Sequence, residues 1–326
     1  MSTPSELAAA TRMRRGDQRA PILVTGAPRS GTTFLGTVLA LNREVSYIYE
    51  PMSGSHGLRD VPSPLLYVRS GSRNEAAAER MTRDLLAGRG SFRRPPSVGS
   101  ASLPRAVARR LIGSHGSLRY RRDVLSPSRR RWLLKDPWAA FASEWLHRQI
   151  GMQTVVIVRH PVPTVSSYRR LGWDFPLEQL IAMDELMADH LAPILGGLDV
   201  HALDPLENAA MVWRTYYYVL ARYIDRNPDM IVVRHEDLCA EPLRVLEGLY
   251  DKLDLRFDSR VRDYVTEYTG KGNQVEATAT QLHELHRDSA AVAKKWRTEV
   301  DAADRATIRK WTEPEASRWY SDDDWA

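Results

Sequence analysis

Short apolar runs alternate along this chain with longer stretches in which apolar residues recur every three or four positions. The apolar runs predict β-strands at residues 22–24, 45–49, 132–134, 153–158 and 230–233. The amphipathic stretches predict helices at residues 34–41, 75–86, 138–150, 162–171, 176–195, 205–226, 242–253, 259–268 and 302–311. Strands that alternate with helices indicate an α/β protein, in which a central parallel sheet is flanked by helices on both faces within a single domain.

The chain between the first strand and the first helix has the composition of a phosphate-binding loop. Gly26 follows the strand, and the run Arg29-Ser30-Gly31-Thr32-Thr33 leads into the helix. Backbone N–H groups at a helix N-terminus that is reached through a glycine turn bind anions. The Walker A pattern requires lysine where this chain has Thr32. Because Arg29 offers a permanent planar charge instead, we expect a P-loop-like fold that holds an anionic donor without a Mg²⁺ clamp.

Chemically reactive side chains follow several of the predicted strands. Thr25, Glu50, Lys135 and Arg159 lie at or just beyond strand ends. Ligands of parallel sheets bind beyond the carboxyl ends of the strands. Reactive groups at four separate strand ends therefore favour a functional site over simple packing.

The composition is that of an ordinary globular protein. The 326 residues include one cysteine, Cys239, so an internal disulfide is impossible and the reducing cytoplasm is the expected location. No apolar run approaches the length of a transmembrane span. Residues 1–20 contain arginines among small and polar residues but no apolar signal core, so we expect a flexible tail there.

The net charge of +5 conceals a strong local asymmetry. Residues 91–131 contain eleven arginines and one acid, Asp123, so this segment carries +10 and the rest of the chain sums to −5. The segment is either a solvated surface insertion or an electropositive rim that attracts an anionic donor or acceptor. Nucleic acid is not an expected partner, because aromatic residues are sparse among these arginines and no recognition motif accompanies them.

Two motifs resemble those of the PAPS-dependent sulfotransferases, which use 3′-phosphoadenosine 5′-phosphosulfate. Residues 27–33 resemble the family's 5′-phosphosulfate loop. Residues 156–161, followed by Ser167, resemble its 3′-phosphate site, and the resemblance implies that Arg159 and Ser167 hold this phosphate. Eight residues carry the chain from the strand end into the second turn of the next helix, so both side chains can reach one phosphate. His160 departs from the Asp or Asn of most relatives.

Further segments extend the resemblance to about residue 297. Residues 230–238 resemble the family's late strand, and residues 287–297 resemble the segment that closes over the nucleotide. Tyr49-Glu50-Pro51 resembles the carbohydrate 6-O-sulfotransferases, whereas residues 133–137 resemble tyrosylprotein and bacterial members. The resemblance implies a sulfotransferase domain at residues 21–326, in which the basic insertion at residues 53–131 shapes the acceptor site.

The resemblance also implies roles for individual residues. Glu50 matches the catalytic base, which takes the proton of the acceptor hydroxyl. Lys135 matches the lysine on the bridging oxygen of the phosphosulfate, and together with Arg29 it can neutralise the leaving oxygen. No metal is expected. The residues expected to bind the donor are Arg29, Ser30, Gly31, Thr32, Thr33, Arg159, Ser167 and Ser289.

The sequence therefore predicts sulfuryl transfer from PAPS to an acceptor hydroxyl, which leaves adenosine 3′,5′-bisphosphate. The expected acceptor is a small molecule or glycan, with the hydroxyl on a sugar or a glycosylated metabolite. A P-loop kinase-like phosphotransferase is one alternative, although it would need the missing lysine and a metal-binding acid. A non-catalytic nucleotide-binding protein is another.

Several of these residues also have purely structural alternatives. Glu50 could cap a helix, Lys135 could pair only with Asp136, and Ser289 could be a helix N-cap. Histidine is the base in cytosolic aryl sulfotransferases, which makes His56, close behind Glu50, a rival base. Trp296 and the tyrosines at 216–218 are expected to be packing residues.

Overall fold

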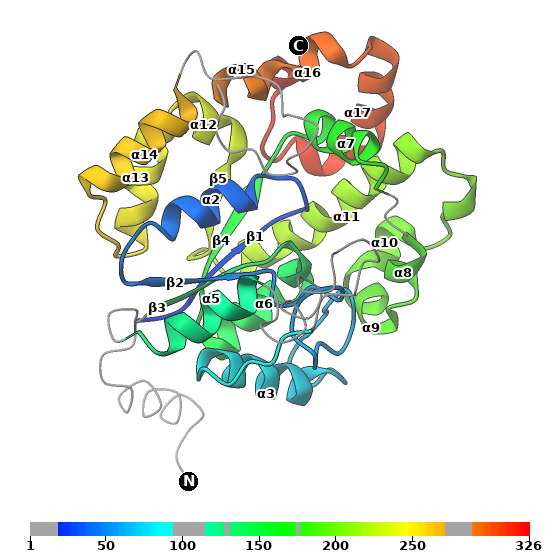
Figure 1. The fold of residues 1–326 in the computed structure, drawn as a ribbon. Helices are drawn as coiled ribbons and strands as arrows, with labels where there is room; N and C mark the ends of the chain where they lie inside the picture. Colours follow the sequence, from blue (N-terminus) through cyan, green and yellow to red (C-terminus); the bar gives the residue numbers. More distant parts are fainter. Residues whose placement is uncertain (1–18, 94–114, 127–130, 174–176, 271–288) are drawn as a thin grey trace, which may run out of the picture.

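A five-stranded sheet crosses the described part of the molecule, which comprises residues 19–93, 115–126, 131–173, 177–270 and 289–326 of a computed structural model (Figure 1). Every neighbouring pair of strands in it is parallel, as predicted, and the order is β2-β3-β1-β4-β5. Each strand begins and ends within one residue of its predicted position. The strands are β1 (Ile22–Thr25), β2 (Val45–Tyr49), β3 (Arg131–Lys135), β4 (Gln153–Val158) and β5 (Ile231–Arg234).

Helices connect the successive strands. Between β1 and β3 the described helices are α2 (Thr32–Leu39), α3 (Glu75–Leu86) and α5 (His115–Val124). Between β3 and β5 they are η1 (Pro137–Ala142), α6 (Ser143–Trp145), η2 (Leu146–Ile150), α7 (Pro161–Arg170), α8 (Leu177–Ile181), α9 (Asp184–Leu186), η3 (Met187–Leu191), α10 (Ala192–Leu195), η4 (Val200–Ala202) and α11 (Pro205–Arg226). After β5 they are α12 (His235–Ala240), α13 (Pro242–Lys252), α14 (Ser259–Thr269), α15 (Ser289–Lys294), α16 (Trp296–Glu299), α17 (Ala302–Ala316) and α18 (Asp322–Trp325).

Helices cover both faces of the sheet, because alternate residues of each strand point to opposite sides. Ile22 and Val24 of β1 face the layer formed by α2, α13 and α14. Leu23 of the same strand packs on the other face with η1 and α3, and Val156 and Val158 of β4 pack there against α7 and α11. Figure 1 shows α2, α13 and α14 grouped on one side of the strands. The predicted α/β fold with two helical layers is confirmed.

The long helix α11 fixes the carboxyl end of β4. It spans the predicted range, and a capping box between Asp204 and Glu207 closes its N-terminus. Tyr217 donates its hydroxyl to the carbonyl of Ile157 at 3.1 Å and accepts the N–H of Arg159 at 3.4 Å. Trp213 donates to the carbonyl of Arg159 at 2.9 Å. The tyrosines at 216–218 are buried, as expected, and Tyr217 also holds the strand end that carries Arg159.

Two predicted helices are less regular than the sequence pattern indicates. Residues 138–150 form 3₁₀, α and π turns in succession rather than one α-helix. The single helix predicted at 176–195 is wrong, because the chain leaves the helix at Ala182 and Met183 and then forms π turns over η3. Leu186, Leu191 and Leu195 are all buried, and a spacing of five residues stays on one face only where the turn is widened in this way.

Two arginines of the basic segment, Arg119 and Arg131, take part in packing. Arg131 is 3% exposed and donates to the carbonyl oxygens of Ala20 and Leu253 at 2.7 and 2.5 Å. Burial lowers the pKa of Arg131 to about 10. The guanidinium of Arg119 lies 5.1 Å from the ring centroid of Tyr47 on β2. Arg119 therefore connects the segment to β2, and Arg131 connects β3 to the chain before β1 and to the end of α13.

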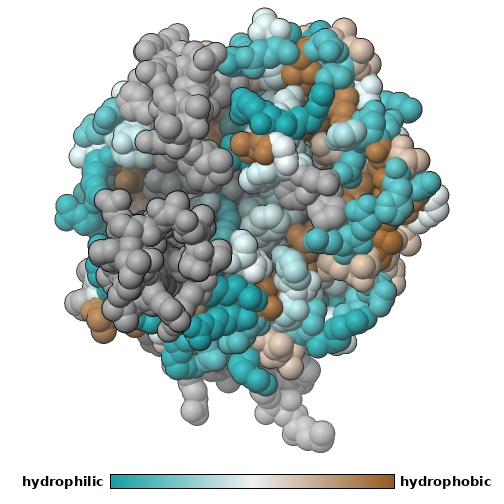
Figure 2. All heavy atoms as spheres, turned by 45° about the vertical axis from the view of Figure 1, so that its right-hand side comes forward, coloured by the Kyte–Doolittle hydropathy of each residue, from teal (hydrophilic) through white to brown (hydrophobic). Residues whose placement is uncertain are grey.

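The surface of the described residues carries few large apolar side chains. On the face shown in Figure 2, hydrophilic residues predominate and apolar residues occur in small groups between them. Leu118 and Val124 of α5, with Leu125 directly after it, are the exposed large apolar side chains among the residues that the structure describes. Within the same residues, no helix combines the length and apolar character that crossing a membrane requires.

Substitution of Gly26 by alanine should lower the free energy of unfolding by about 1–3 kcal/mol, the range typical of overpacking. Gly26 has a φ of 150°, and an added Cβ would lie 2.3 Å from the carbonyl oxygen of Ile157. That oxygen already accepts from Tyr217, so it cannot move freely. Gly248→Ala on α13 is the matched control, because its Cβ would meet nothing within 4 Å. The control should gain about 1 kcal/mol from helix propensity. Denaturant unfolding measures both, and equal stabilities would contradict the close approach of this loop to β4.

Candidate active site

The loop between β1 and α2 is bent by three residues with positive φ. The angles are 150° at Gly26, 66° at Arg29 and 101° at Gly31. Gly31 directly precedes α2, and a Cβ there would lie 2.8 Å from the imidazole ring of His235. Among the residues that the structure describes, no side chain caps this end of α2, so the first N–H groups of the helix can bind a ligand oxygen. The predicted anion cradle therefore has the required backbone geometry.

Arg29, Arg159 and Ser167 meet beside this loop. Arg29 Nε donates to Ser167 Oγ at 3.1 Å, and Arg159 Nη1 donates to the carbonyl oxygen of Arg29 at 2.9 Å. Tyr168 on α7 adds a hydrogen bond of 2.8 Å to the carbonyl oxygen of Pro28. The structure therefore ties the loop after β1 to the strand end and helix that carry the second motif.

Arg159 has an unused donor at this place. Its Nε atom is buried and has no hydrogen-bond partner among the residues that the structure describes. A buried donor without a partner costs free energy unless a ligand or water satisfies it. An anionic oxygen beside Arg159 would satisfy this donor, so the side chain fits the expected role.

Glu50 lies directly after β2, in a backbone conformation that is rare for a residue other than glycine. Its φ is 45°, and its N–H donates to the carbonyl oxygen of Lys135 at 2.8 Å. Its Oε1 accepts from Lys135 Nζ at 2.5 Å. Its Oε2 accepts from Trp138 Nε1 and lies close to His56 Nε2, both at 3.2 Å. Glu50 therefore belongs to a buried polar cluster rather than to a helix cap.

The charge of Glu50 is stabilised by these neighbours. Burial alone raises the pKa of this carboxyl, but His56, Lys135 and Trp138 outweigh it and lower the pKa to about 2. His56, the rival base of the sequence analysis, also approaches Ser55, whose Oγ lies 2.9 Å from His56 Nδ1. The structure thus places His56 beside Glu50 as its partner.

Lys135 is the most deeply buried cation of the site, with 1% of its surface exposed. Burial lowers its pKa, while the charge of Glu50 acts in the opposite direction. Its Nζ lies 4.0 Å from the ring centroid of Tyr49. The side chain passes Gly36 of α2, where a Cβ would lie 3.0 Å from Lys135 Cγ. Lys135 therefore pairs with Glu50, and a small residue on α2 makes room for it.

Asp136 has a separate, structural role. It is completely buried and accepts from the backbone N–H groups of Met52 and Trp138 at 2.5 and 2.9 Å. Burial, with a contribution from Glu50, raises the pKa of Asp136 to about 7. Asp136 therefore fixes the chain after Glu50 against the start of η1.

The other predicted residues are placed as follows. Ser30 and Thr32 are buried at the start of α2, and Thr33 follows them. Thr25 donates to the carbonyl oxygen of Asp136 at 2.8 Å, which is a structural contact. Ser289 is the first residue of α15, but its side chain lies outside what the structure describes. Trp296 is 5% exposed within the core.

Sequence reasoning missed two contributors to this site. Trp138 donates to Glu50, and Gly36 makes room for Lys135. Trp138 directly follows the Lys-Asp-Pro run, so the sequence itself placed it next to the expected site. Nothing in the sequence marks Gly36, because its role depends on how α2 packs on β3.

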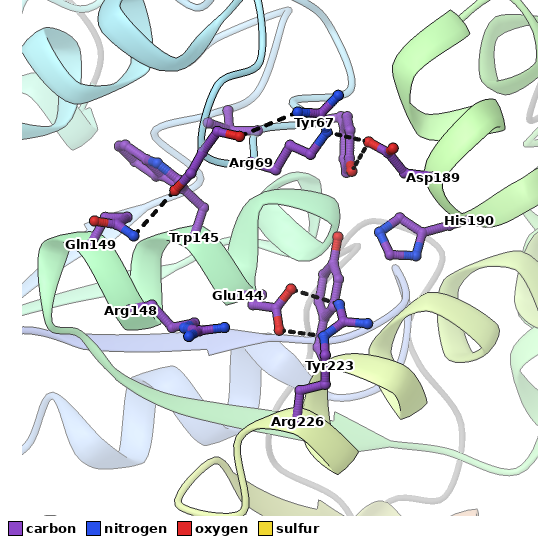
Figure 3. A pocket seen from close by; sticks show the side chains of 12 residues that line it. Tyr67, Arg69, Glu144, Trp145, Arg148, Gln149, Asp189, His190, Tyr223 and Arg226 are labelled. Atoms are coloured by element: carbon purple, nitrogen blue, oxygen red, sulfur yellow. Dashed lines mark hydrogen bonds and ion pairs between the residues drawn. The ribbon is translucent and has the colours of Figure 1, made fainter.

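A separate pocket of about 470 Å³ lies beside η2 and the end of α11 (Figure 3). Its polar groups are largely paired with one another. Arg226 bonds to Glu144 at 2.6 and 2.8 Å, and Arg69 bonds to Asp189. Tyr223, in the pocket wall, is ten residues beyond Trp213 on α11, or about 15 Å along the helix axis. This pocket is therefore distinct from the cluster around Glu50 and Arg159.

A parallel sheet with a glycine loop before its first helix, and with a buried ammonium–carboxylate pair at the carboxyl ends of its strands, defines an α/β protein of the P-loop-like class. The sulfotransferase family model matches residues 21–259, which is more than half of the chain. The chain belongs to the sulfotransferase family and is a sulfotransferase enzyme.

A solved sulfotransferase structure shares the fold, and two more distant sulfotransferases are also similar to this chain. The sulfotransferase domain from the curacin biosynthetic pathway is 18% identical over 92% of this chain and 97% of that chain, with a TM-score of 0.50. The corresponding domain of the Synechococcus PCC 7002 olefin synthase is 19% identical over 94% and 98%, with a TM-score of 0.47. Mouse sulfotransferase SULT7A1 complexed with PAP is 11% identical over 94% and 86%, with a TM-score of 0.41. A comparison with curated proteins found no match.

Acid should destabilise the wild-type protein through Glu50. The folded pKa of about 2 lies below the ordinary value of 4.5. The stabilisation from this ionised carboxylate is therefore complete above about pH 4.5 and is lost as the pH falls toward about 2. Denaturant unfolding of the wild type and of Glu50→Gln, between about pH 6 and pH 3, should give a difference in stability that shrinks at low pH. The exposed Glu44→Gln is the control. A difference that does not change with pH would contradict the depressed pKa.

Proposed function

We propose that the enzyme transfers the sulfuryl group of PAPS to an acceptor hydroxyl and releases adenosine 3′,5′-bisphosphate. The observation that carries the proposal is the buried Lys135–Glu50 pair, with 2.5 Å between Nζ and Oε1, at the same sheet edge as the loop of Arg29. Transfer of a sulfuryl group between two oxygens needs a base, a cation at the leaving oxygen and an anion cradle. In this proposal Glu50 is the base, Lys135 is the cation and the loop of Arg29 is the cradle.

The two anionic ends of the donor have separate partners in this proposal. The N–H groups at the start of α2 and the guanidinium of Arg29 bind the 5′-phosphosulfate, with Ser30, Thr32 and Thr33 around it. Arg159 and Ser167 bind the 3′-phosphate, which satisfies the buried Nε of Arg159. Binding exchanges the Arg29–Ser167 hydrogen bond for bonds to the ligand. Ser289 remains a further candidate for the donor phosphate.

The catalytic roles follow from the pair. PAPS supplies a sulfuryl group whose bond to the bridging phosphate oxygen breaks as the acceptor oxygen bonds to sulfur. Glu50 receives the proton of the acceptor hydroxyl, while Lys135 and Arg29 stabilise the negative charge on the leaving oxygen. When Lys135 turns from Glu50 to that oxygen, Glu50 loses a cationic partner and becomes a stronger base. Trp138 donates to the second carboxylate oxygen and holds it in place, and His56 Nε2 lies 3.2 Å from the same oxygen.

The acceptor hydroxyl is proposed to lie on a sugar or a glycosylated metabolite. The support for this class is the Tyr49-Glu50-Pro51 run, which resembles that of carbohydrate 6-O-sulfotransferases. Residues 53–131 are proposed to shape the acceptor site, since their chain follows Glu50 directly. An acceptor panel of free sugars, glycosylated metabolites and simple alcohols or phenols tests this class, because transfer confined to non-glycosylated acceptors would exclude it.

Glu50→Gln and Lys135→Ala should each lower the rate of sulfate transfer by about 100-fold or more, since each removes a proton acceptor or a charge at the reacting atoms. The assay measures radiolabelled sulfate transferred from PAPS, with mass spectrometry of the product. The exposed Glu44→Gln and Lys252→Ala are matched controls, and His56→Asn should lose less activity than Glu50→Gln. Retained activity in Glu50→Gln, or turnover of ATP with Mg²⁺ in place of PAPS, would overturn the proposal.

Arg159→Ala should weaken binding of adenosine 3′,5′-bisphosphate about tenfold or more, as expected for the loss of a charged hydrogen bond. Affinity for adenosine 5′-phosphate, which lacks the 3′-phosphate, should change little. Titration calorimetry with both nucleotides measures this selectivity. Arg170→Ala, an exposed arginine on α7, is the control. Equal losses for both nucleotides would remove Arg159 from the 3′-phosphate site.

A further inference from the structure

A cage of aromatic rings surrounds His160, the residue after Arg159. The imidazole stacks on Trp296, with ring centroids 4.9 Å apart and planes inclined by 10°. Tyr320 and Trp325 meet it edge-on, with centroids at 4.8 and 4.5 Å. Only 2% of His160 is exposed. The ring therefore has a single, well-defined position.

In that position His160 is the N-cap of helix α7. Its ring atom Nδ1 accepts the backbone N–H of Val162 at 3.3 Å. The backbone N–H of His160 donates to Glu236 Oε1 at 3.0 Å. An Nδ1 that accepts requires a neutral ring with the proton on Nε2, and burial lowers the pKa of His160 to about 3. His160 thus caps α7 in the way that Asp or Asn commonly does. It stands between Arg159 and the helix that carries Ser167.

Contacts with other elements of the fold hold Tyr320 and Trp325, two of the rings of the cage, in place. Ser321 and Asp324 form a capping box around α18, and Asp324 accepts from Arg234 of β5 at 3.1 Å. Arg309 of α17 pairs with Asp322, and its guanidinium lies 5.1 Å from the ring centroid of Trp325. The Tyr320 hydroxyl donates to Glu236 Oε2 at 2.9 Å, so Glu236 bonds to both Tyr320 and His160.

We propose that Trp296, Tyr320 and Trp325 are positioning residues for the nucleotide. By holding the imidazole of His160 at the start of α7, they fix the placement of Arg159 relative to Ser167. The inference rests on the proposed function, which assigns those two residues to the 3′-phosphate. Without the Trp325 ring, the imidazole can turn away from the N–H of Val162, and the end of β4 and the start of α7 lose their common support.

Trp325→Ala should raise the Kd for adenosine 3′,5′-bisphosphate about fivefold, the factor that corresponds to one lost helix cap. The Kd for adenosine 5′-phosphate should change by less than about twofold, because the 3′-phosphate partners alone are displaced. Trp325→Phe keeps a ring in the cage and should restore most of the affinity. Trp311→Ala is the control, because Trp311 lies outside the cage and donates to Glu207 in the first turn of α11 at 3.1 Å. Calorimetry with the two nucleotides gives all four comparisons.

A double-mutant cycle separates positioning from general stability. His160→Asn keeps a capping acceptor but has no ring for the cage to hold. In that background Trp325→Ala should not raise the Kd for the bisphosphate further, because the residue through which it acts is gone. The inference would be overturned if Trp325→Ala lowered the affinity for the bisphosphate equally in the wild type and in His160→Asn. It would also be overturned if the variant lost affinity equally for both nucleotides.

Two further results keep the inference distinct from the proposed function. If Trp325→Ala does not fold, Tyr320→Phe replaces it, since only the hydroxyl bonded to Glu236 is removed. This variant should raise the Kd for the bisphosphate about threefold, at the low end of the range for one lost hydrogen bond, and an unchanged Kd would refute the positioning role. If the wild type itself does not bind the bisphosphate, the proposed function fails. If the wild type binds and Trp325→Ala binds equally well, only the positioning role fails.

Discussion

The ion pair between Lys135 and Glu50 is held away from water, and this burial constrains the elements around it. Neither charge is stable alone in such surroundings, so each requires the other together with further hydrogen bonds. Tyr49 and Lys135 are paired in register on β2 and β3. Because Glu50 directly follows Tyr49, this register brings the side chains of Glu50 and Lys135 together at the carboxyl ends of the two strands. Gly36 leaves room for the lysine stem. Two strands and α2 therefore contribute to keeping one pair charged.

Backbone strain is concentrated at the same place. Among the described residues, the non-glycine positions with positive φ are Arg29, Glu50 and Asp254, and the first two belong to the site. Such conformations persist only where the surroundings enforce them. Arg159 bonds to the carbonyl of Arg29, and the N–H of Glu50 bonds to Lys135. Other residues of the site thus make the contacts that hold Arg29 and Glu50 in these conformations. The backbone at one part of the site therefore depends on the side chains of another.

Much of this arrangement could be predicted because a parallel sheet gathers strand ends at one edge. That rule placed Glu50, Lys135 and Arg159 near one another without knowledge of helix packing. Contacts between helices and strands could not be found in this way, and Gly36 and Trp138 were missed for that reason. Local irregularity was hidden as well, since the π turns of η3 change the spacing on which helix prediction depends. The likeness of residues 287–297 to a nucleotide-closing segment gave no sign that Trp296 stacks on His160.

The cap of α7 shows how a departure from a family pattern can be compensated elsewhere in the chain. The family model ends at residue 259, and the rings around His160 all lie beyond that point. An aspartate in this cage would place a charge among two indoles and a phenol, at a considerable cost in desolvation. A neutral imidazole accepts the same backbone N–H and also packs against the rings. The histidine and its aromatic cage are therefore best understood as one unit, because neither the ring nor its walls would be favourable without the other.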